Sequence, residues 1–255
     1  EDTVVKIEIF DDAGSLVKTY ASDQNKLCSD DPYSTAKPNP PGNKSGFNRF
    51  VWNLKTEPLA CNPGLIHNPR SGTYTVAPGT YTAKITAGDF NAEQSFNVIA
   101  SPDLTVDPDF TEYKTVTAKL HNAANEMIEN VKSIYNIKKQ IDVITEVSNS
   151  DVAKEESEKL TAKLDQWHDK ILNKNLQTFQ DIIRYPNKMA LNFSFLLEDI
   201  SGAGIPVNNG MSEVADRYMA EWMEAKSEYD NLMSNDVKAY NQAMENAGLP
   251  KIYLP

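Results

Sequence analysis

Three histidines are the side chains best suited to acid–base or metal chemistry, and they lie far apart in the sequence. His67 belongs to a loop rich in proline and asparagine, whereas His121 and His168 lie within long amphipathic segments. The sequence contains neither the H-E-x-x-H motif nor any pair of histidines at metal-ligand spacing. No neighbouring serine or cysteine suggests a nucleophile beside His67. We therefore predict no catalytic residue, no metal site and no cofactor, and we interpret His168 as flanking a buried stripe.

Carboxylates are numerous, with 36 aspartates and glutamates, so some will lie close together by chance. The segment "DVAKEESEKL" has the Glu–Lys spacing of a solvated helix face rather than of an acid/base pair. "SDD" at Ser29 to Asp31 and "DPD" at Asp107 to Asp109 could supply oxygen ligands to calcium. Neither follows the alternating pattern of a calcium loop, and the glycine-rich phosphate-binding motifs do not occur. These carboxylates do not indicate a site.

Three aromatic residues could form a platform for sugar rings, namely Trp52, Tyr74 and Tyr81. The alternative for Trp52 is a place in the core, because it alternates in phase with Phe50 and Leu54. We favour the core for Trp52. Tyr74 remains the candidate ligand-binding residue.

The overall charge excludes several classes of partner. The chain has 255 residues and a formal net charge of −11. Nucleic acids and anionic membrane surfaces attract basic proteins, so neither is expected here. No apolar run approaches the roughly 18 residues that cross a bilayer, so we predict no membrane insertion. No feature of the sequence specifies an oligomeric state.

Two cysteines lie in loop-like segments rich in proline, asparagine and aspartate. Cys28 and Cys61 could be two free surface thiols, or they could form a disulfide. A bridge between them would stabilise the fold by about 3–4 kcal/mol in the chain-entropy model. We favour the disulfide, which implies an oxidising compartment.

Residues 1–101 show the period of two that is typical of strands. Val5, Ile7 and Ile9 alternate with polar residues, and "DDAG" then provides a turn. Further strands are predicted in "SLVKTY", "FNRFVWNL", "TYTAKITA" and "NAEQSFNVIA". About five to seven short strands separated by turns predict an antiparallel β-sandwich with long loops. The chain enters its first strand without a signal peptide, and we expect it to be part of a longer polypeptide.

Near Asp107 the period changes to that of helices. Asp107 and Pro108 resemble a helix start, and Ser150 and Ser212 are predicted caps of later helices. Gly248 and Pro250 are predicted to end the last helix. Apolar residues recur at steps of three and four in segments that follow, including Leu120, Ala124, Met127, Val131, Ile134 and Ile141, then Leu160, Leu164, Trp167 and Ile171.

The second of these helices is predicted to continue through Leu172, Leu176 and Phe179 to Ile183, and a shorter one to follow Pro186. Long amphipathic helices joined by short breaks bury their stripes against one another. Residues 102–255 are therefore predicted to form an antiparallel bundle of three long helices with a shorter fourth. The fold class is α+β, with a domain boundary near residue 101.

The order of these motifs resembles a known family. "IEIFDDAGSLVKTY", "GFNRFVWNLK" and "APGTYTAKITAGD" are similar to the immunoglobulin-like module of flagellar hook-cap scaffold proteins of the FlgD type. With "YPNKMALNFSFLL" and "AYNQAMENAGLPKI", nearly the whole chain resembles the C-terminal region of secreted bacterial sortilin-like proteins. These carry a β-propeller of BNR repeats and are often labelled glycosyl hydrolases. The chain departs from the pattern at "WNL", where an aspartate often follows the tryptophan.

The resemblance implies an extracytoplasmic protein whose propeller lies upstream of this chain. It implies that any glycosidase-like activity resides in that propeller, so no catalytic residue is carried onto this chain. The expected function is a non-catalytic accessory region that packs against the propeller and supports assembly or substrate presentation. Two alternatives are a carbohydrate-binding module that uses the loops from Asn62 to Tyr74, and a part of a glycosidase whose site the missing domain completes.

Overall fold

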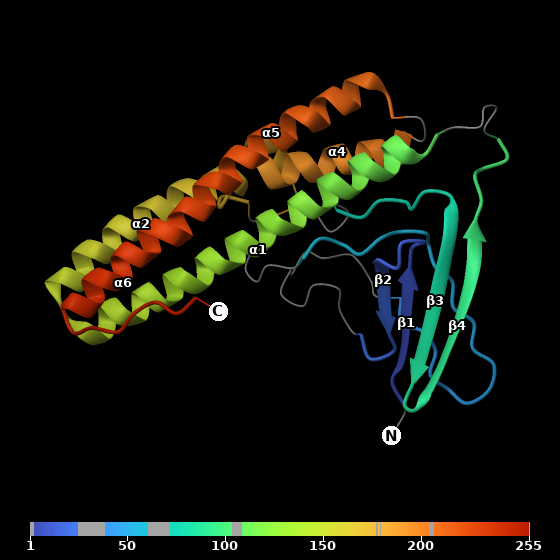
Figure 1. Ribbon diagram of the computed structural model, residues 1–255, viewed down its shortest axis with the longest axis horizontal. Helices are drawn as coiled ribbons and strands as arrows, with labels where there is room; N and C mark the ends of the chain where they lie inside the picture. Colours follow the sequence, from blue (N-terminus) through green and yellow to red (C-terminus); the bar gives the residue numbers. More distant parts are fainter. Residues whose placement is uncertain are drawn as a thin grey trace.

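The computed structural model describes residues 3–24, 39–60, 72–103, 109–176, 178, 180–203 and 207–254. Its N-terminal part contains one antiparallel sheet in the order β2-β1-β3-β4. The strands are β1 (Val5–Phe10), β2 (Leu16–Ala21), β3 (Gly79–Ala87) and β4 (Phe90–Val98). The predicted strands in these segments are confirmed, and a mixed fold of sheet followed by helices is observed (Figure 1).

Side chains of one sheet face form a small core. Ile7 pairs with Tyr20 on β2 and with Ile85 on β3, so all three lie on the same face. Ile7, Tyr20 and Tyr81 are buried on this face, as the alternation in the sequence predicts. The turn between β1 and β2 is closed by Asp11, whose carboxylate accepts the backbone N–H groups of Ala13 and Ser15 at 3.1 and 2.7 Å.

The predicted strand around Trp52 is not formed. Residues 47–54 have no strand pairing, and the neighbouring Lys55 makes only an isolated bridge with Thr75. Leu54 adopts a positive φ of 59°, and the indole N–H of Trp52 donates to the carbonyl of Lys55 at 3.0 Å. The backbone therefore turns where a strand would continue.

Trp52 nevertheless lies against the sheet, as its alternation with Phe50 predicts. Its ring centroid is 5.5 Å from that of Tyr81 and 6.1 Å from that of Phe96, in edge-to-face contacts. Phe50 contacts Tyr20 in the same way, with centroids 4.6 Å apart. The segment thus supplies side chains to the core without joining the sheet.

The first long helix is α1 (Thr111–Ser148). The proposed start at Asp107 and Pro108 falls outside the described residues, while the carboxylate of Asp109 accepts the N–H of Thr111 at 2.8 Å. Helix α1 ends at Asn149, which has a left-handed φ of 44°. The predicted apolar stripe is confirmed, because all of its members are buried: Leu120, Ala124, Met127, Val131, Ile134 and Ile141.

Helix α2 (Asp151–Ile171) begins at the predicted cap, where the Ser150 hydroxyl accepts the N–H of Ala153 at 3.4 Å. The prediction that it continues to Ile183 is wrong. The amide oxygen of Asn173 accepts the N–H of Asn175 at 3.0 Å, and such a local bond competes with helical pairing. Ile183 instead lies in the short α3 (Asp181–Arg184) and is 88% exposed.

The remaining helices are α4 (Met189–Ala203), α5 (Asn209–Asn231) and α6 (Val237–Asn246), with a π-helical turn at Leu232–Asp236 between α5 and α6. The cap of α5 is Asn208 rather than the predicted Ser212, because the Asn208 side chain accepts the N–H of Met211 at 2.9 Å. Gly248 ends α6 as predicted. Its φ is 70°, and the N–H of Leu249 reaches the carbonyl of Met244 at 2.8 Å.

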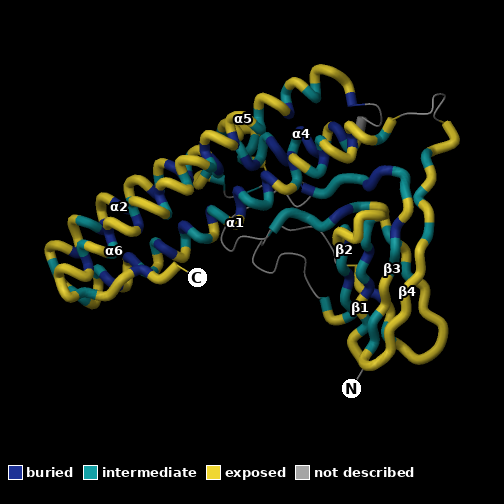
Figure 2. The backbone as a smooth tube through the Cα atoms, viewed as in Figure 1, coloured by how far each residue is buried: buried dark blue, intermediate teal, exposed yellow. Residues whose placement is uncertain are grey.

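The helices form an elongated body, and the sheet lies beside the N-terminal half of α1 (Figure 1). Helix α1 packs against α2, α4 and α5, and α2 packs against α6. Buried positions face the interior of this body and exposed positions face outward (Figure 2). The indole N–H of Trp167 on α2 donates to the carbonyl of Ala225 on α5 at 2.7 Å. Among the described helices, none is both long and apolar enough to cross a bilayer.

Candidate functional site

The sheet and the helices meet along a seam formed by residues 55–60 and 72–77 on one side and by α1 and α4 on the other. At its centre, the Tyr113 hydroxyl donates to the carbonyl of Thr75 at 2.6 Å. The N–H of Thr75 donates to the hydroxyl of Ser201 at 2.9 Å. The ammonium of Lys55 lies 3.3 Å from the same hydroxyl. The backbone carbonyl of Thr75 is therefore hydrogen-bonded to α1, and its backbone N–H is hydrogen-bonded to α4.

His121 holds a second part of the seam. Its Nε2 lies 3.0 Å from the carbonyl of Glu57, and the amide nitrogen of Asn125 lies 3.3 Å from its Nδ1. The amide oxygen of Asn125 accepts the N–H of Ala60 at 2.8 Å. Because the Asn125 oxygen is an acceptor, its nitrogen is the donor, so Nδ1 of His121 accepts and Nε2 carries the proton. Burial lowers the pKa of His121, which keeps the ring neutral.

The carboxylate of Glu57 is also engaged within the sheet unit. One oxygen lies 3.0 Å from the ammonium of Lys18, and the other accepts the backbone N–H of Thr19. Lys18 is 7% exposed, so this ion pair is partly shielded from water. Because both oxygens have partners, Glu57 is not arranged as a free acid or base.

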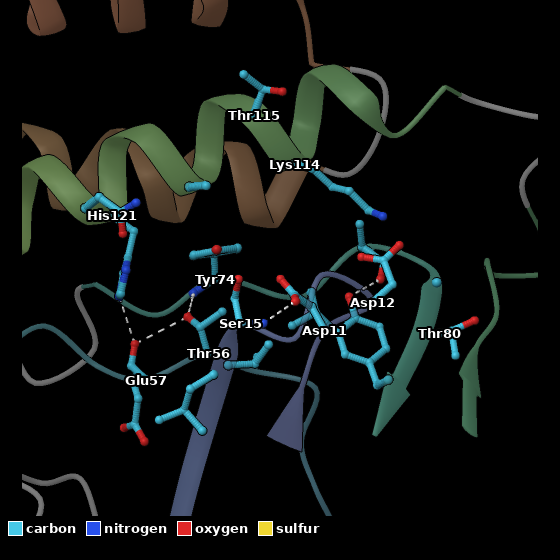
Figure 3. Close-up of a pocket in the computed structure, with 18 residues that line it drawn as sticks. Asp11, Asp12, Ser15, Thr56, Glu57, Tyr74, Thr80, Lys114, Thr115 and His121 are labelled. Atoms are coloured by element: carbon cyan, nitrogen blue, oxygen red, sulfur yellow. Dashed lines mark hydrogen bonds between the residues drawn. The ribbon is translucent and has the colours of Figure 1, made fainter. Parts of the chain in front are cut away.

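A cleft of about 460 Å³ lies beside the seam, between the β1–β2 turn and α1 (Figure 3). Asp11 and Asp12 lie at the turn, and Lys114 extends from α1 toward them. The floor is formed by apolar and aromatic side chains, including Val17, Tyr74 and Tyr81. A mouth with charges of both signs over such a floor is suited to a small polar ligand.

Tyr74, the predicted ligand-binding candidate, lines this cleft. Its ring is in edge-to-face contact with His121, with centroids 5.6 Å apart. Its backbone N–H donates to the hydroxyl of Thr56 at 3.2 Å. Burial raises the pKa of Tyr74, so its hydroxyl stays protonated. The side chain is half-buried and shared between the cleft and the seam.

Tyr81 lines the same cleft. Burial and the negative charges of Asp11 and Asp12 raise its pKa to about 12. Its hydroxyl donates to the carbonyl of Ala77 at 2.7 Å. Tyr81 therefore fixes the loop that leads into β3, and its hydroxyl proton is already engaged.

The other residues considered in the sequence are not brought together. Cys28, Cys61 and His67 lie outside the described residues, as do Asn62 and the segment from Ser29 to Asp31. His168 is predicted at the edge of the apolar stripe, and the structure instead buries this side chain in the helical body. Its Nε2 lies 3.4 Å from the Tyr135 hydroxyl and its Nδ1 3.5 Å from Asp169, while burial lowers its pKa.

No chemistry-bearing cluster converges within the part of the chain that the structure describes. No group of three or more histidine, cysteine, aspartate or glutamate side chains there could hold a metal ion. The seam histidine, Glu57 and Ser201 each have backbone partners. The arrangement binds protein backbone, and the adjoining cleft offers room for a ligand.

Sequence reasoning missed the seam, although one signal was present. Tyr113, Thr117, His121 and Asn125 recur every four residues on α1. Residues at this spacing share one helix face, so a row of hydrogen-bonding side chains beside an apolar stripe indicates a polar contact surface. The partners Thr75 and Glu57 have no such signal.

Comparisons with known proteins give no identification. No protein-family model matches this chain, and searches of curated proteins and of solved structures find no match either. The resemblance to FlgD-type modules and to sortilin-like propeller proteins therefore stays a prediction.

Proposed function

We propose that this chain is a non-catalytic accessory region of a larger secreted β-propeller protein. The sheet and the helices act as one rigid body that packs against an upstream propeller and supports assembly or substrate presentation. The observation that carries the proposal is the seam, where His121, Tyr113 and Ser201 are all bonded to backbone groups of the sheet unit. Side chains of the types that enzymes use for chemistry serve here to join two units.

Finer features of the fold belong to the same proposal. The sheet is one layer of an immunoglobulin-like sandwich, and residues 50–56 and 74–77 contribute to the opposite layer. Helices α1, α2 and the continuous α5–α6 form an antiparallel bundle, to which α4 is added. The contacts of Trp52 with the sheet and those of α1 with α2 and α5 support this arrangement. The protein works outside the cytoplasm, where Cys28 and Cys61 form a disulfide.

An activity assay tests the absence of catalysis. The purified chain is incubated with a broad panel of glycans and chromogenic glycosides, and no turnover is expected. Glu57→Gln is compared with Glu93→Gln, which changes an exposed strand residue. Reproducible hydrolysis that disappears in Glu57→Gln and persists in Glu93→Gln would contradict the proposal.

A carbohydrate-binding module is the second candidate, favoured by the position of Tyr74 in the cleft. Glycan-array binding that weakens in Tyr74→Ala and not in Tyr253→Ala, a change of an exposed tail residue, would support it. A flat array would remove it. The third candidate, a glycosidase completed by this chain, requires the full-length protein to be more active than its propeller alone.

A further inference from the structure

The cleft beside the seam carries opposite charges on the two sides of its mouth. Asp12 belongs to the turn between β1 and β2, and Lys114 extends toward this turn from the start of α1 (Figure 3). Within the described part of the chain, neither side chain forms a salt bridge or a hydrogen bond. The ammonium of Lys114 lies beside Gly79, 3.5 Å from the position that a β-carbon would take there. Both charges are therefore open to a ligand in the cleft.

The turn between β1 and β2 makes its side of the cleft negative. Asp11 uses one carboxylate oxygen to accept two backbone N–H groups of the turn, at 3.1 and 2.7 Å. Burial raises the pKa of Tyr81 to about 12, and the charges of Asp11 and Asp12 add to this effect, so both carboxylates act on the cleft floor. Glu57, the third carboxylate that lines the cleft, pairs with Lys18 at 3.0 Å. The turn therefore favours a ligand group with a positive charge.

The cleft offers apolar surface rather than the open face of an aromatic ring. Leu16 and Val17 line it, and Leu16 is 52% exposed while Val17 is half-buried. Tyr81 is only 5% exposed, and its ring stacks on Phe96 with centroids 6.3 Å apart. A sugar ring needs a free aromatic face, whereas an aliphatic side chain needs only apolar surface to cover. The lining therefore suits an aliphatic group.

We infer that this cleft binds a free α-amino acid with an aliphatic side chain. The ammonium group of the ligand pairs with Asp11 and Asp12, and its carboxylate pairs with Lys114. Its side chain packs on Leu16 and Val17. The volume of about 460 Å³ lies within the range of roughly 300–1,000 Å³ that is typical of small-molecule sites. The inference goes beyond the proposed function and does not depend on an upstream propeller.

The test is isothermal titration calorimetry of the full chain with three ligands of nearly the same shape. L-Leucine carries both charged groups, L-leucinamide lacks the carboxylate, and 4-methylpentanoate lacks the ammonium group. We expect saturable binding of leucine. The other two ligands should each bind at least about tenfold more weakly, because each loses a hydrogen bond between charged groups.

Two variants and two matched controls assign this binding to the cleft. Asp12→Asn and Lys114→Met should each weaken the binding of leucine at least about tenfold. Asp89→Asn, in the turn between β3 and β4, and Lys119→Met, on α1, remove the same charges from positions that do not line the cleft. These controls should bind leucine as the wild-type chain does. All four positions are exposed, so the variants should fold, and circular dichroism checks that they do.

Three results would overturn the inference. The first is the absence of saturable leucine binding to the folded wild-type chain. The second is equal binding of leucine, leucinamide and 4-methylpentanoate. The third is a loss of binding in Asp89→Asn or Lys119→Met as large as in the cleft variants. Binding of neutral oligosaccharides in place of leucine would also overturn it and would favour the carbohydrate-binding candidate.

Discussion

The hydroxyl of Ser201 accepts the backbone N–H of Thr75 at 2.9 Å, although 126 residues separate them in the sequence. This bond joins α4 to the loop before β3. Because Tyr113 binds the carbonyl of the same residue, both polar backbone groups of Thr75 are held by helices. Backbone groups of the sheet unit are thereby fixed against the helical body.

Ser201→Ala removes one of the two hydrogen bonds that helices make to the backbone of Thr75. The partly buried N–H of Thr75 then lacks its partner, and losing such a hydrogen bond costs about 0.5–1.5 kcal/mol. The free energy of unfolding in urea should fall by that amount. Ser234→Ala is the matched control, since its hydroxyl binds only the carbonyl of Asp230 on an exposed helix surface. Equal effects of the two substitutions would contradict the role of Ser201.

Acid should weaken the seam through His121. Burial holds the pKa of His121 below its ordinary value of 6.5, against the opposing effect of Glu57, while Lys18 favours the neutral ring. The unfolded chain therefore binds a proton that the folded chain does not, and stability falls as the pH falls below 6.5. Protonation also removes the acceptor at Nδ1, on which Asn125 and hence Ala60 depend.

Amide hydrogen exchange at Ala60, measured between neutral pH and about pH 5, checks this prediction. Its protection should decline with acid in the wild-type chain and be insensitive to pH in His121→Gln. His168→Gln serves as the control, because burial lowers the pKa of His168 in the helical body as well. Protection at Ala60 that declines with acid to the same extent in His121→Gln would refute the role of His121.

The helical body depends on close packing of its core. Leu164 on α2 is fully buried, and Leu→Ala at such a position costs about 2–5 kcal/mol. Val143→Ala on α1 is the control, since Val143 is 58% exposed and should change stability by no more than about 0.5 kcal/mol. Urea unfolding followed by circular dichroism measures both. A small effect of Leu164→Ala would show that α2 is not part of the core.

Cys28 and Cys61 should be linked when the protein is produced in an oxidising compartment. Peptide mapping by mass spectrometry without reduction should identify a single cross-linked peptide pair. Cys28→Ser should lower the free energy of unfolding by about 3–4 kcal/mol under oxidising conditions and leave it nearly unchanged under reducing ones. Two alkylated free thiols in the native, oxidised protein would contradict the bridge.

Local signals in the sequence predicted much of the helical part. The stripe of α1, the Ser150 cap and the Gly248 terminus each depend on residues within a few positions of one another, so periodicity and capping chemistry are sufficient. Helix α2 ended early because the Asn173 side chain forms a local bond that an apolar pattern does not report. The turn at Leu54 likewise escaped the alternation of Phe50 and Trp52.

The seam could not be predicted in the same way. Thr75, Glu57 and Ser201 have no distinctive neighbours, and their pairing follows from how the sheet is placed against α1 and α4. Tyr74 is the ligand-binding candidate from the sequence, and the structure places it half-buried against His121. Its position depends on α1, which begins only at Thr111, after β3 and β4.

The central claim is that the sheet and the helices form one rigid body. Hydrogen exchange of residues 79–98 and 111–148, followed by mass spectrometry as urea rises, tests it most directly. One shared transition is predicted for the wild-type chain, and two separate ones for the Ser201→Ala/His121→Gln double variant. A wild-type sheet that opens at lower urea while α1 stays protected would contradict the claim.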